Sequence, residues 1–123
     1  MIHLDAHVAV WAYASRRRLS SSARRLLARG SCQVSPIVLL EIEMLFELRR
    51  VAADATAILT RLSEQIDLTV CDTPLVRVVE TARTFAWTRD PFDRLIVANA
   101  MADGARLLTA DETILANFKD AVW

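Results

Sequence analysis

Short apolar runs alternate with longer stretches of helical periodicity along the chain. We expect four short strands, at Met1–Asp5, Cys32–Ser35, Leu68–Cys71 and Arg106–Thr109. Between and after them the pattern predicts helices over Ala6–Ala14, Ser20 to Arg29, Pro36 to about Arg50, Ala52–Gln65, Pro74 to about Ala86, Pro91–Asp103 and Glu112–Asn117. Strands that alternate with helices favour an α/β fold, in which a central parallel sheet of about four strands is flanked by helices.

Three dipeptides mark the starts of predicted helices. Ser35-Pro36, Thr73-Pro74 and Asp90-Pro91 each combine a capping side chain with a proline, which is favoured at the first helical position. Gly30 and Gly104 follow predicted helices and are suited to ending them. Ligands of such folds bind beyond the carboxyl ends of the strands, so the search for chemistry begins at that edge.

Composition restricts the class of protein. A chain of 123 residues fits one domain, predicted here to span residues 1–123, and 54% of its residues are hydrophobic. The most apolar stretch, Ile37–Leu48, contains three glutamates, which argues against a membrane span. The N-terminus lacks the pattern of a signal peptide. Cys32 and Cys71 lie in largely apolar segments and are interpreted as small buried hydrophobic residues in a reducing compartment, so we expect a cytoplasmic protein.

Charge is distributed unevenly, although the formal net charge is zero. Six arginines precede Gly30, against the single acid Asp5. The planar guanidinium can donate two hydrogen bonds to one phosphate, so this segment is suited to a nucleic acid. A solvated helix face explains the same arginines equally well.

Four acids follow or lie close to predicted strand ends. Asp5 closes the first strand, and Asp111 lies just past the fourth. Glu41 and Asp93 occupy early turns of two helices that begin at or near the same edge. Parallel strands end at a common edge, so we expect these carboxylates to face one another. Carboxylates held close together repel unless a cation joins them, and Mg²⁺ or Mn²⁺ prefers such oxygen ligands.

Each acid also has a purely structural interpretation. Asp5, Asp90 and Asp111 are suitable N-caps, and an acid at position 93 complements a helix dipole. No other constellation competes with the acids, because the chain lacks a glycine-rich phosphate loop. His3 and His7 straddle a strand–helix junction and lack the glutamate that follows the first histidine in a zinc protease helix.

Four segments in order resemble the PIN domain, specifically the VapC-family toxins of type II toxin–antitoxin systems. They are Ile2–Val8, Val34–Ile42, Arg89–Ala100 and Leu107–Asp111. The most specific is Asp-Pro-Phe-Asp-Arg at residues 90–94, which resembles a block found in one large VapC subgroup. One departure is Ala6, where many members have a small hydroxyl residue.

The resemblance implies a flavodoxin-like α/β/α sandwich and a Mg²⁺- or Mn²⁺-dependent endoribonuclease with one or two ions. It places the catalytic metal ligands at Asp5, Glu41, Asp93 and Asp111. Thr109 and Asp90 are possible accessory residues, although the cap role of Asp90 suffices. Arg94 and the N-terminal arginines are further candidates, as contacts for phosphates. The resemblance also implies an RNA substrate, a cognate VapB-type antitoxin and a homodimer, without a membrane partner.

Two other functions fit parts of the pattern. In a non-catalytic PIN-like module that binds protein or RNA, the same acids would hold an arginine of a partner. A magnesium-dependent phosphatase or phosphoryl receiver of similar fold is disfavoured. Phosphatases that form an aspartyl phosphate have a second aspartate two residues after the first, and position 7 is histidine.

Overall fold

Five short parallel strands form one sheet in the order β3-β2-β1-β4-β5 in the computed structural model, which describes all 123 residues. The strands are β1 (Ile2–Leu4), β2 (Cys32–Val34), β3 (Thr69–Val70), β4 (Arg106–Leu108) and β5 (Ala121–Val122). The helices are α1 (Ala6–Ala14), α2 (Ser21–Ala28), α3 (Pro36–Glu47), α4 (Ala55–Ile66), α5 (Leu75–Ala82), α6 (Pro91–Ala102) and α7 (Glu112–Asn117), with a 3₁₀ turn, η1, at Arg16–Arg18.

The predicted fold class is confirmed, with one strand more than expected. All four strand pairings are parallel, and β1 lies at the centre of the sheet between β2 and β4. The strand that the pattern did not reveal is β5, which has only two residues and is defined by its pairing with β4. A strand this short has no alternation of polar and apolar residues that could predict it.

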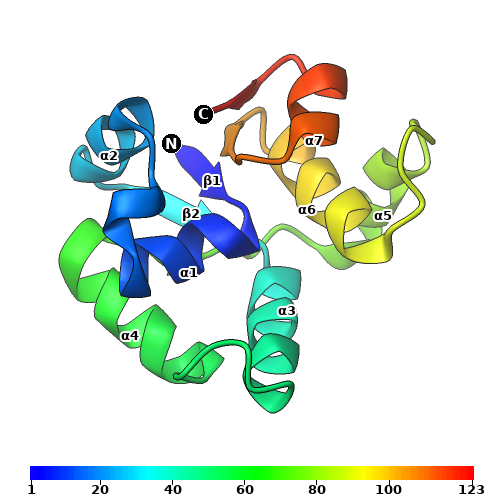
Figure 1. Ribbon diagram of the computed structural model, residues 1–123. Coiled ribbons are helices and arrows are strands. Elements are labelled where there is room, and N and C mark those ends of the chain that lie inside the picture. Colours follow the sequence, from blue (N-terminus) through cyan, green and yellow to red (C-terminus); the bar gives the residue numbers. More distant parts are fainter.

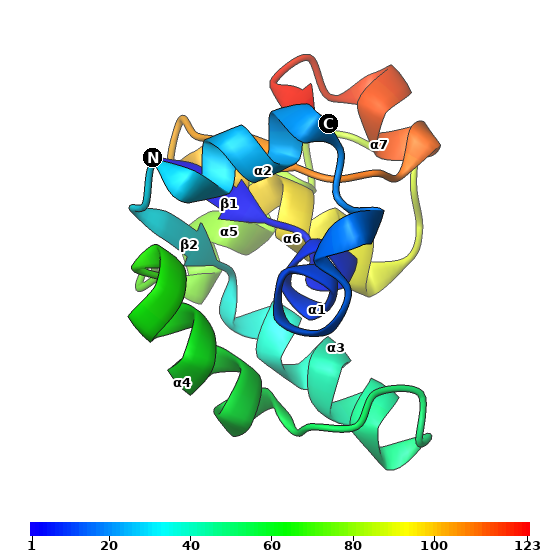
Figure 2. The same ribbon diagram turned by 60° about the vertical axis from the view of Figure 1, so that its left-hand side comes forward.

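Helices cover both faces of the sheet (Figure 1). Helices α1 and α4 pack together on one side, and α5 packs against α6 on the other. Helix α3 leaves the carboxyl end of β2 and contacts both α1 and α6. Figure 2, turned by 60°, shows the same arrangement with α3 below β1. The start of α1 and the middle of α3 are thereby brought to one end of the sheet.

The core is built by the apolar runs that predicted the strands. Leu4, Leu107 and Leu108 are fully buried at the centre of the sheet, and Val8 and Ile96 pack on them from helices. Burying a side chain of this size stabilises the fold by about 1.5–3 kcal/mol. None of the seven helices has the length and apolar composition that crossing a bilayer requires.

The predicted helix start at Asp90-Pro91 is confirmed, and the one at Thr73-Pro74 is wrong by one residue. The Asp90 carboxylate accepts hydrogen bonds from the backbone N–H groups of Phe92 and Asp93, and Pro91 follows as the first helical residue. Ser35 occupies the N-cap of α3 by its backbone, but its hydroxyl makes no cap bond. Helix α5 begins after Pro74, one residue later than predicted, because the Thr73 hydroxyl bonds to Asp103 instead.

Both cysteines are free and buried, as expected. The interpretation of Cys71 as a residue in apolar surroundings is wrong, since its sulfur contacts polar groups of Thr73, Asn99 and Asp103. Burial opposes ionisation of Asp103, but hydrogen bonds from Cys71 and Thr73 and the nearby His3 lower the pKa of its carboxyl group below the ordinary value. This polar group lies apart from the acids that the sequence singled out.

Candidate active site

Asp5 lies at the carboxyl end of the central strand and is almost fully buried, with 4% of its surface exposed. One carboxylate oxygen, Oδ1, accepts the backbone N–H of Ala6 at 2.8 Å, which makes Asp5 the N-cap of α1. The other, Oδ2, accepts the hydroxyl of Thr109 at 2.7 Å. The structural and functional interpretations of Asp5 are therefore compatible.

Thr109 connects Asp5 to Asp111 at the end of β4. Its oxygen donates to Asp5 and accepts the backbone N–H of Asp111 at 3.0 Å. Asp111 in turn caps α7, because its Oδ1 accepts the N–H of Ile114 at 2.9 Å. Only one oxygen of Asp111 is used in the cap, which leaves the other available to a ligand.

Glu41 and Asp93 have the most strongly perturbed carboxyl groups of this edge. Burial raises the pKa of Glu41 to about 7, assisted by the charges of Asp5, Asp93 and Asp90. Burial likewise raises the pKa of Asp93 to about 6, together with the charges of Asp90, Asp5 and Asp111. Acids from distant parts of the chain thus raise the pKa values of Glu41 and Asp93, so the fold gathers negative charge in one place.

One oxygen of Glu41, Oε2, is buried and has no hydrogen-bond partner. Burying a carboxylate oxygen without a hydrogen-bond partner costs free energy. Such an oxygen is found where a proton, a cation or another ligand binds it. Glu41 lies in the second turn of α3, between the buried residues Val38 and Ile42. Glu41 is therefore a half-buried acid beside core residues of the same helix.

Asp90 contributes charge to the same edge, although its carboxylate caps α6 and is exposed. Burial raises the pKa of Asp93 most, and the charge of Asp90 has the next largest raising effect. The cap thereby fixes the first turn of α6, in which Asp93 is located. The proposed accessory role of Asp90 remains a prediction.

Sequence reasoning missed His7 as a member of this group. Its Nε2 accepts the backbone N–H of Ala110 at 2.9 Å, so the other ring nitrogen, Nδ1, is the protonated one in the neutral ring. Nδ1 lies 3.6 Å from Oδ2 of Asp5. Burial lowers the pKa of His7 despite the nearby charges of Asp5 and Asp111. The feature of the sequence that could have identified His7 is its position in the first helical turn after Asp5. That position brings its side chain to the carboxyl end of the strand.

The donor set fits a hard divalent cation. Four carboxylates, one buried oxygen without a partner and two raised pKa values are what an acidic cation site looks like before its cation is bound. The carboxylates are not crowded together, since no three of them bring oxygens within 4.8 Å of one another.

Arg18 and Arg94 differ in where their guanidinium groups lie. Arg18 lies with its guanidinium carbon 4.4 Å from the centre of the Trp11 ring, and its charge acts on His7. Arg94 is directed to α5, where its Nε donates to the carbonyl of Ala82 at 3.0 Å and its guanidinium lies over Phe85. Arg18 is therefore better placed than Arg94 to meet a phosphate.

Comparison with known proteins identifies the family of the chain. The family model of the PIN domain matches residues 2–120. The chain belongs to the PIN-domain family. This PIN domain is 35% identical over 114 residues to Ribonuclease VapC22 of Mycobacterium tuberculosis (strain ATCC 25618 / H37Rv), which covers 90% of this chain and 87% of that relative. The resemblance predicted from four segments is thereby confirmed.

Solved structures share the fold of this PIN domain at low sequence identity. A toxin–antitoxin complex from Klebsiella pneumoniae matches with a TM-score of 0.72 and 16% identity, covering 100% of this chain and 97% of that chain. VapBC2 from Rickettsia felis, bound to a DNA fragment from their promoter, matches with a TM-score of 0.65 and 18% identity, covering 99% and 96%. PAE2754 from Pyrobaculum aerophilum matches with a TM-score of 0.61 and 21% identity, covering 98% and 87%.

Thr109 offers a test of how this PIN domain positions Asp5. Thr109→Val keeps the shape but removes the donor to Asp5 and the acceptor of the Asp111 N–H, so it is expected to cost about 1.5–3 kcal/mol in the free energy of unfolding. Thr109→Ser keeps the hydroxyl and loses one methyl group, at about 1 kcal/mol. Urea unfolding measures both variants. A valine variant as stable as the serine variant would show that the hydrogen bonds are unimportant.

Proposed function

We propose that the protein is a metal-dependent endoribonuclease, the toxin of a type II toxin–antitoxin module. The observation that supports this most is the acidic edge, where Glu41 has a buried unpaired oxygen and a pKa of about 7. A relative with 35% identity over most of the chain is a ribonuclease by name. Together they favour hydrolysis of RNA phosphodiester bonds by a metal-activated water.

Asp5, Glu41, Asp93 and Asp111 would hold one or two Mg²⁺ or Mn²⁺ ions. A bound divalent ion lowers the pKa of water and polarises the phosphodiester. Glu41 and Asp93 supply negative charge that burial makes costly, so they have the strongest reason to accept a cation. Asp111 supplies the oxygen that is not used in its helix cap.

Neighbouring residues hold the carboxylates in place. Thr109 and the backbone N–H of Ala6 occupy one lone pair on each oxygen of Asp5, and the remaining lone pairs stay free. His7 presents its Nδ1–H toward Asp5, held there by the bond from Ala110. Arg18, next to this edge, would steady the phosphate of the substrate, because a guanidinium pairs well with phosphate oxygens.

The proposal includes a cognate VapB-type antitoxin, a homodimer and a cytoplasmic location. Exposed apolar side chains on α3 and α5 support a protein partner, since they would otherwise face water. They are Leu40, Met44 and Phe46 on α3, and Leu75, Val76 and Val79 on α5. An exposed apolar area of this kind is typical of an interaction surface.

Cleavage of RNA by the purified chain tests the proposal. We expect cleavage with Mn²⁺ or Mg²⁺, loss of cleavage with a chelator, and recovery when Mn²⁺ is added in excess. A gel-based assay on a mixed cellular RNA substrate reads out all three conditions. Binding of RNA without cleavage in any metal would contradict the proposal and favour a non-catalytic binding module.

A further inference from the structure

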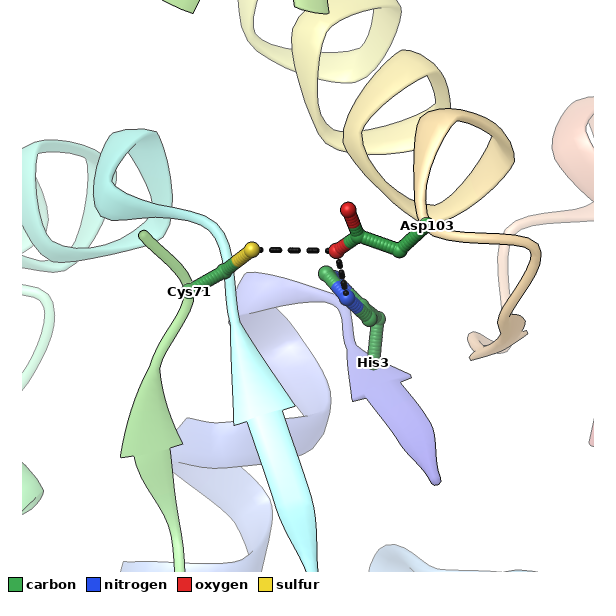
Figure 3. A group of neighbouring side chains, drawn as sticks. All are labelled: His3, Cys71 and Asp103. Carbon is green, nitrogen blue, oxygen red and sulfur yellow. Dashed lines mark hydrogen bonds and ion pairs between the residues drawn. The ribbon is translucent and has the colours of Figure 1, made fainter. Parts of the chain in front are cut away.

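A second group of potential metal ligands lies away from the acidic edge. We call it the His3 cluster; it consists of His3 on β1, Cys71 just after β3, and Asp103 at the end of α6 (Figure 3). One ligand atom of each residue lies within 4.8 Å of those of the other two. Asp103 Oδ2 is 2.8 Å from His3 Nε2 and 3.0 Å from Cys71 Sγ. Three segments far apart in the sequence thus converge on one point.

The imidazole of His3 is buried without a hydrogen-bond partner. Only 1% of His3 is exposed, and neither ring nitrogen has a partner in hydrogen-bond geometry. Nε2 lies 2.8 Å from a carboxylate oxygen of Asp103, which is an ion-pair distance. An imidazole nitrogen and a carboxylate oxygen this close together are both suited to be ligands of one ion.

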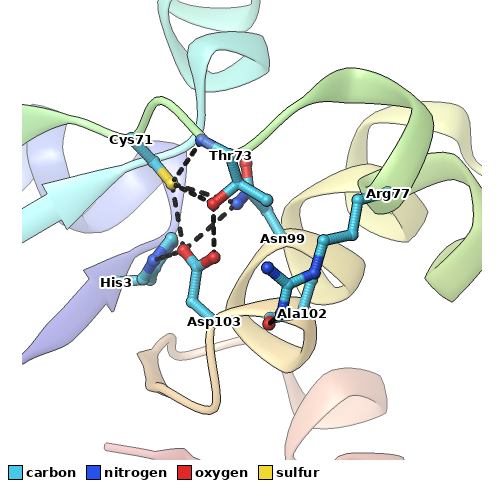
Figure 4. Close-up of polar contacts among 7 residues, drawn as sticks. All are labelled: His3, Cys71, Thr73, Arg77, Asn99, Ala102 and Asp103. Atoms are coloured by element: carbon cyan, nitrogen blue, oxygen red, sulfur yellow. Dashed lines mark hydrogen bonds and ion pairs between the residues drawn. The ribbon is translucent and has the colours of Figure 1, made fainter.

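Neighbouring polar groups support the sulfur and the carboxylate (Figure 4). Cys71 Sγ accepts the side-chain amide of Asn99 at 3.3 Å and the backbone N–H of Thr73 at 3.5 Å. The Thr73 hydroxyl donates to the second oxygen of Asp103. Bonds from neighbouring groups are what orient the ligands of a metal site.

The His3 cluster is separate from the acidic edge, with which it shares no residue. Asp93 lies in the first turn of α6 and Asp103 at its C-cap. Ten residues of α-helix span about 15 Å, so Asp93 and Asp103 lie at opposite ends of the helix. His3 lies two residues before Asp5 in the chain. Gly104, with a φ of 62°, turns the chain away from α6 directly after Asp103. Asp103 is therefore held at a sharply defined end, with 14% of its side chain exposed.

We propose that the His3 cluster is a transition-metal site that takes Zn²⁺, with His3, Cys71 and Asp103 as ligands and water in the fourth position. A thiolate and an imidazole select zinc or cobalt over magnesium, which prefers oxygen ligands. Tetrahedral zinc separates its donor atoms by about 3.3–3.6 Å, so the ligands need to move apart by about half an ångström. The proton of the Cys71 thiol passes to solvent when the sulfur binds the ion. The bound ion would tie β1, the segment after β3 and the end of α6 together.

Titration with Co²⁺ in place of Zn²⁺ tests the site, because a cobalt–thiolate bond gives a charge-transfer band in the near ultraviolet. We expect the band to saturate at one equivalent in the reduced full chain and to disappear when Zn²⁺ is added. Cys71→Ser should abolish it. Cys32→Ser is the matched control and should retain it, since burial raises the pKa of the Cys32 thiol to about 11 and its sulfur makes one hydrogen bond, to the carbonyl of Gly30.

A second variant, Asp103→Asn, tests the site if Cys71→Ser does not fold. It should weaken Co²⁺ binding by about tenfold or more while the band stays present at saturation. Asp93→Asn should leave the band and its midpoint unchanged, which separates this site from the acidic edge. Absence of a thiolate band in the wild-type protein, or its persistence in Cys71→Ser, would overturn the proposal. Neither result depends on whether the chain cleaves RNA.

Discussion

Asp93→Asn is expected to lower the rate of RNA cleavage by about 100-fold or more. A metal ion contributes several kcal/mol to the transition state, and each 1.4 kcal/mol is a factor of ten in rate. Asparagine has nearly the same shape as aspartate but lacks the charge that a divalent ion needs. The loss should appear in a single-turnover cleavage assay at saturating Mn²⁺.

The fold should survive this change. Because burial and three neighbouring acids raise the pKa of Asp93 to about 6, removing its charge relieves repulsion in the metal-free protein. The melting temperature of Asp93→Asn at pH 8 should therefore equal or exceed that of the wild type. Asp120→Asn, an exposed aspartate outside the acidic edge, is the matched control and should cleave normally. Equal activity of the two variants would remove Asp93 from the proposed ligand set.

Stability of the metal-free protein should fall as the pH rises, and a divalent cation should restore it. Glu41 and Asp93 have folded-state pKa values of about 7 and about 6, above the ordinary values of 4.5 and 3.8. The folded state therefore binds protons more tightly than the unfolded chain. The contribution to stability is complete below about pH 4, declines as the pH passes through 6 and 7, and is absent above that.

Melting temperatures at pH 5 and pH 8, with and without Mg²⁺ or Mn²⁺, measure this effect. At pH 8 an ion at about 100 times its Kd should raise the melting temperature by roughly 10 °C. At pH 5 the rise should be smaller, because the ion has to displace protons from Glu41 and Asp93. Glu41→Gln should reduce both the pH dependence and the rise. Glu47→Gln, an exposed change on the same helix, should leave both as in the wild type. A rise of equal size at both pH values would contradict this origin.

The sequence was informative where a rule acts locally. Asp90-Pro91 predicted the start of α6 because the cap bonds join residues two and three positions apart. Thr73-Pro74 misled because the Thr73 hydroxyl bonds to Asp103, thirty residues away. Helix α3 ends at Glu47 and not near Arg50, because Arg49 adopts a left-handed backbone conformation with a φ of 59°, which the apolar pattern does not reveal.

The candidate site followed from topology and resemblance more than from local pattern. Carboxyl ends of parallel strands share an edge, so Asp5 and Asp111 could be placed together, and the structure puts both in contact with Thr109 through hydrogen bonds. Their role as metal ligands stays a prediction. His7 and the His3 cluster could not be predicted, because their contacts join residues about 30 to 100 positions apart, without spacing that marks them.

Anomalous diffraction from crystals of the protein soaked in Mn²⁺ tests the central claim most directly. We predict a manganese peak among Asp5, Glu41, Asp93 and Asp111, with an oxygen of Glu41 in its coordination shell. The peak should be absent from crystals of Asp93→Asn soaked in the same way. Manganese bound only elsewhere, or no peak at these four carboxylates, would contradict the account.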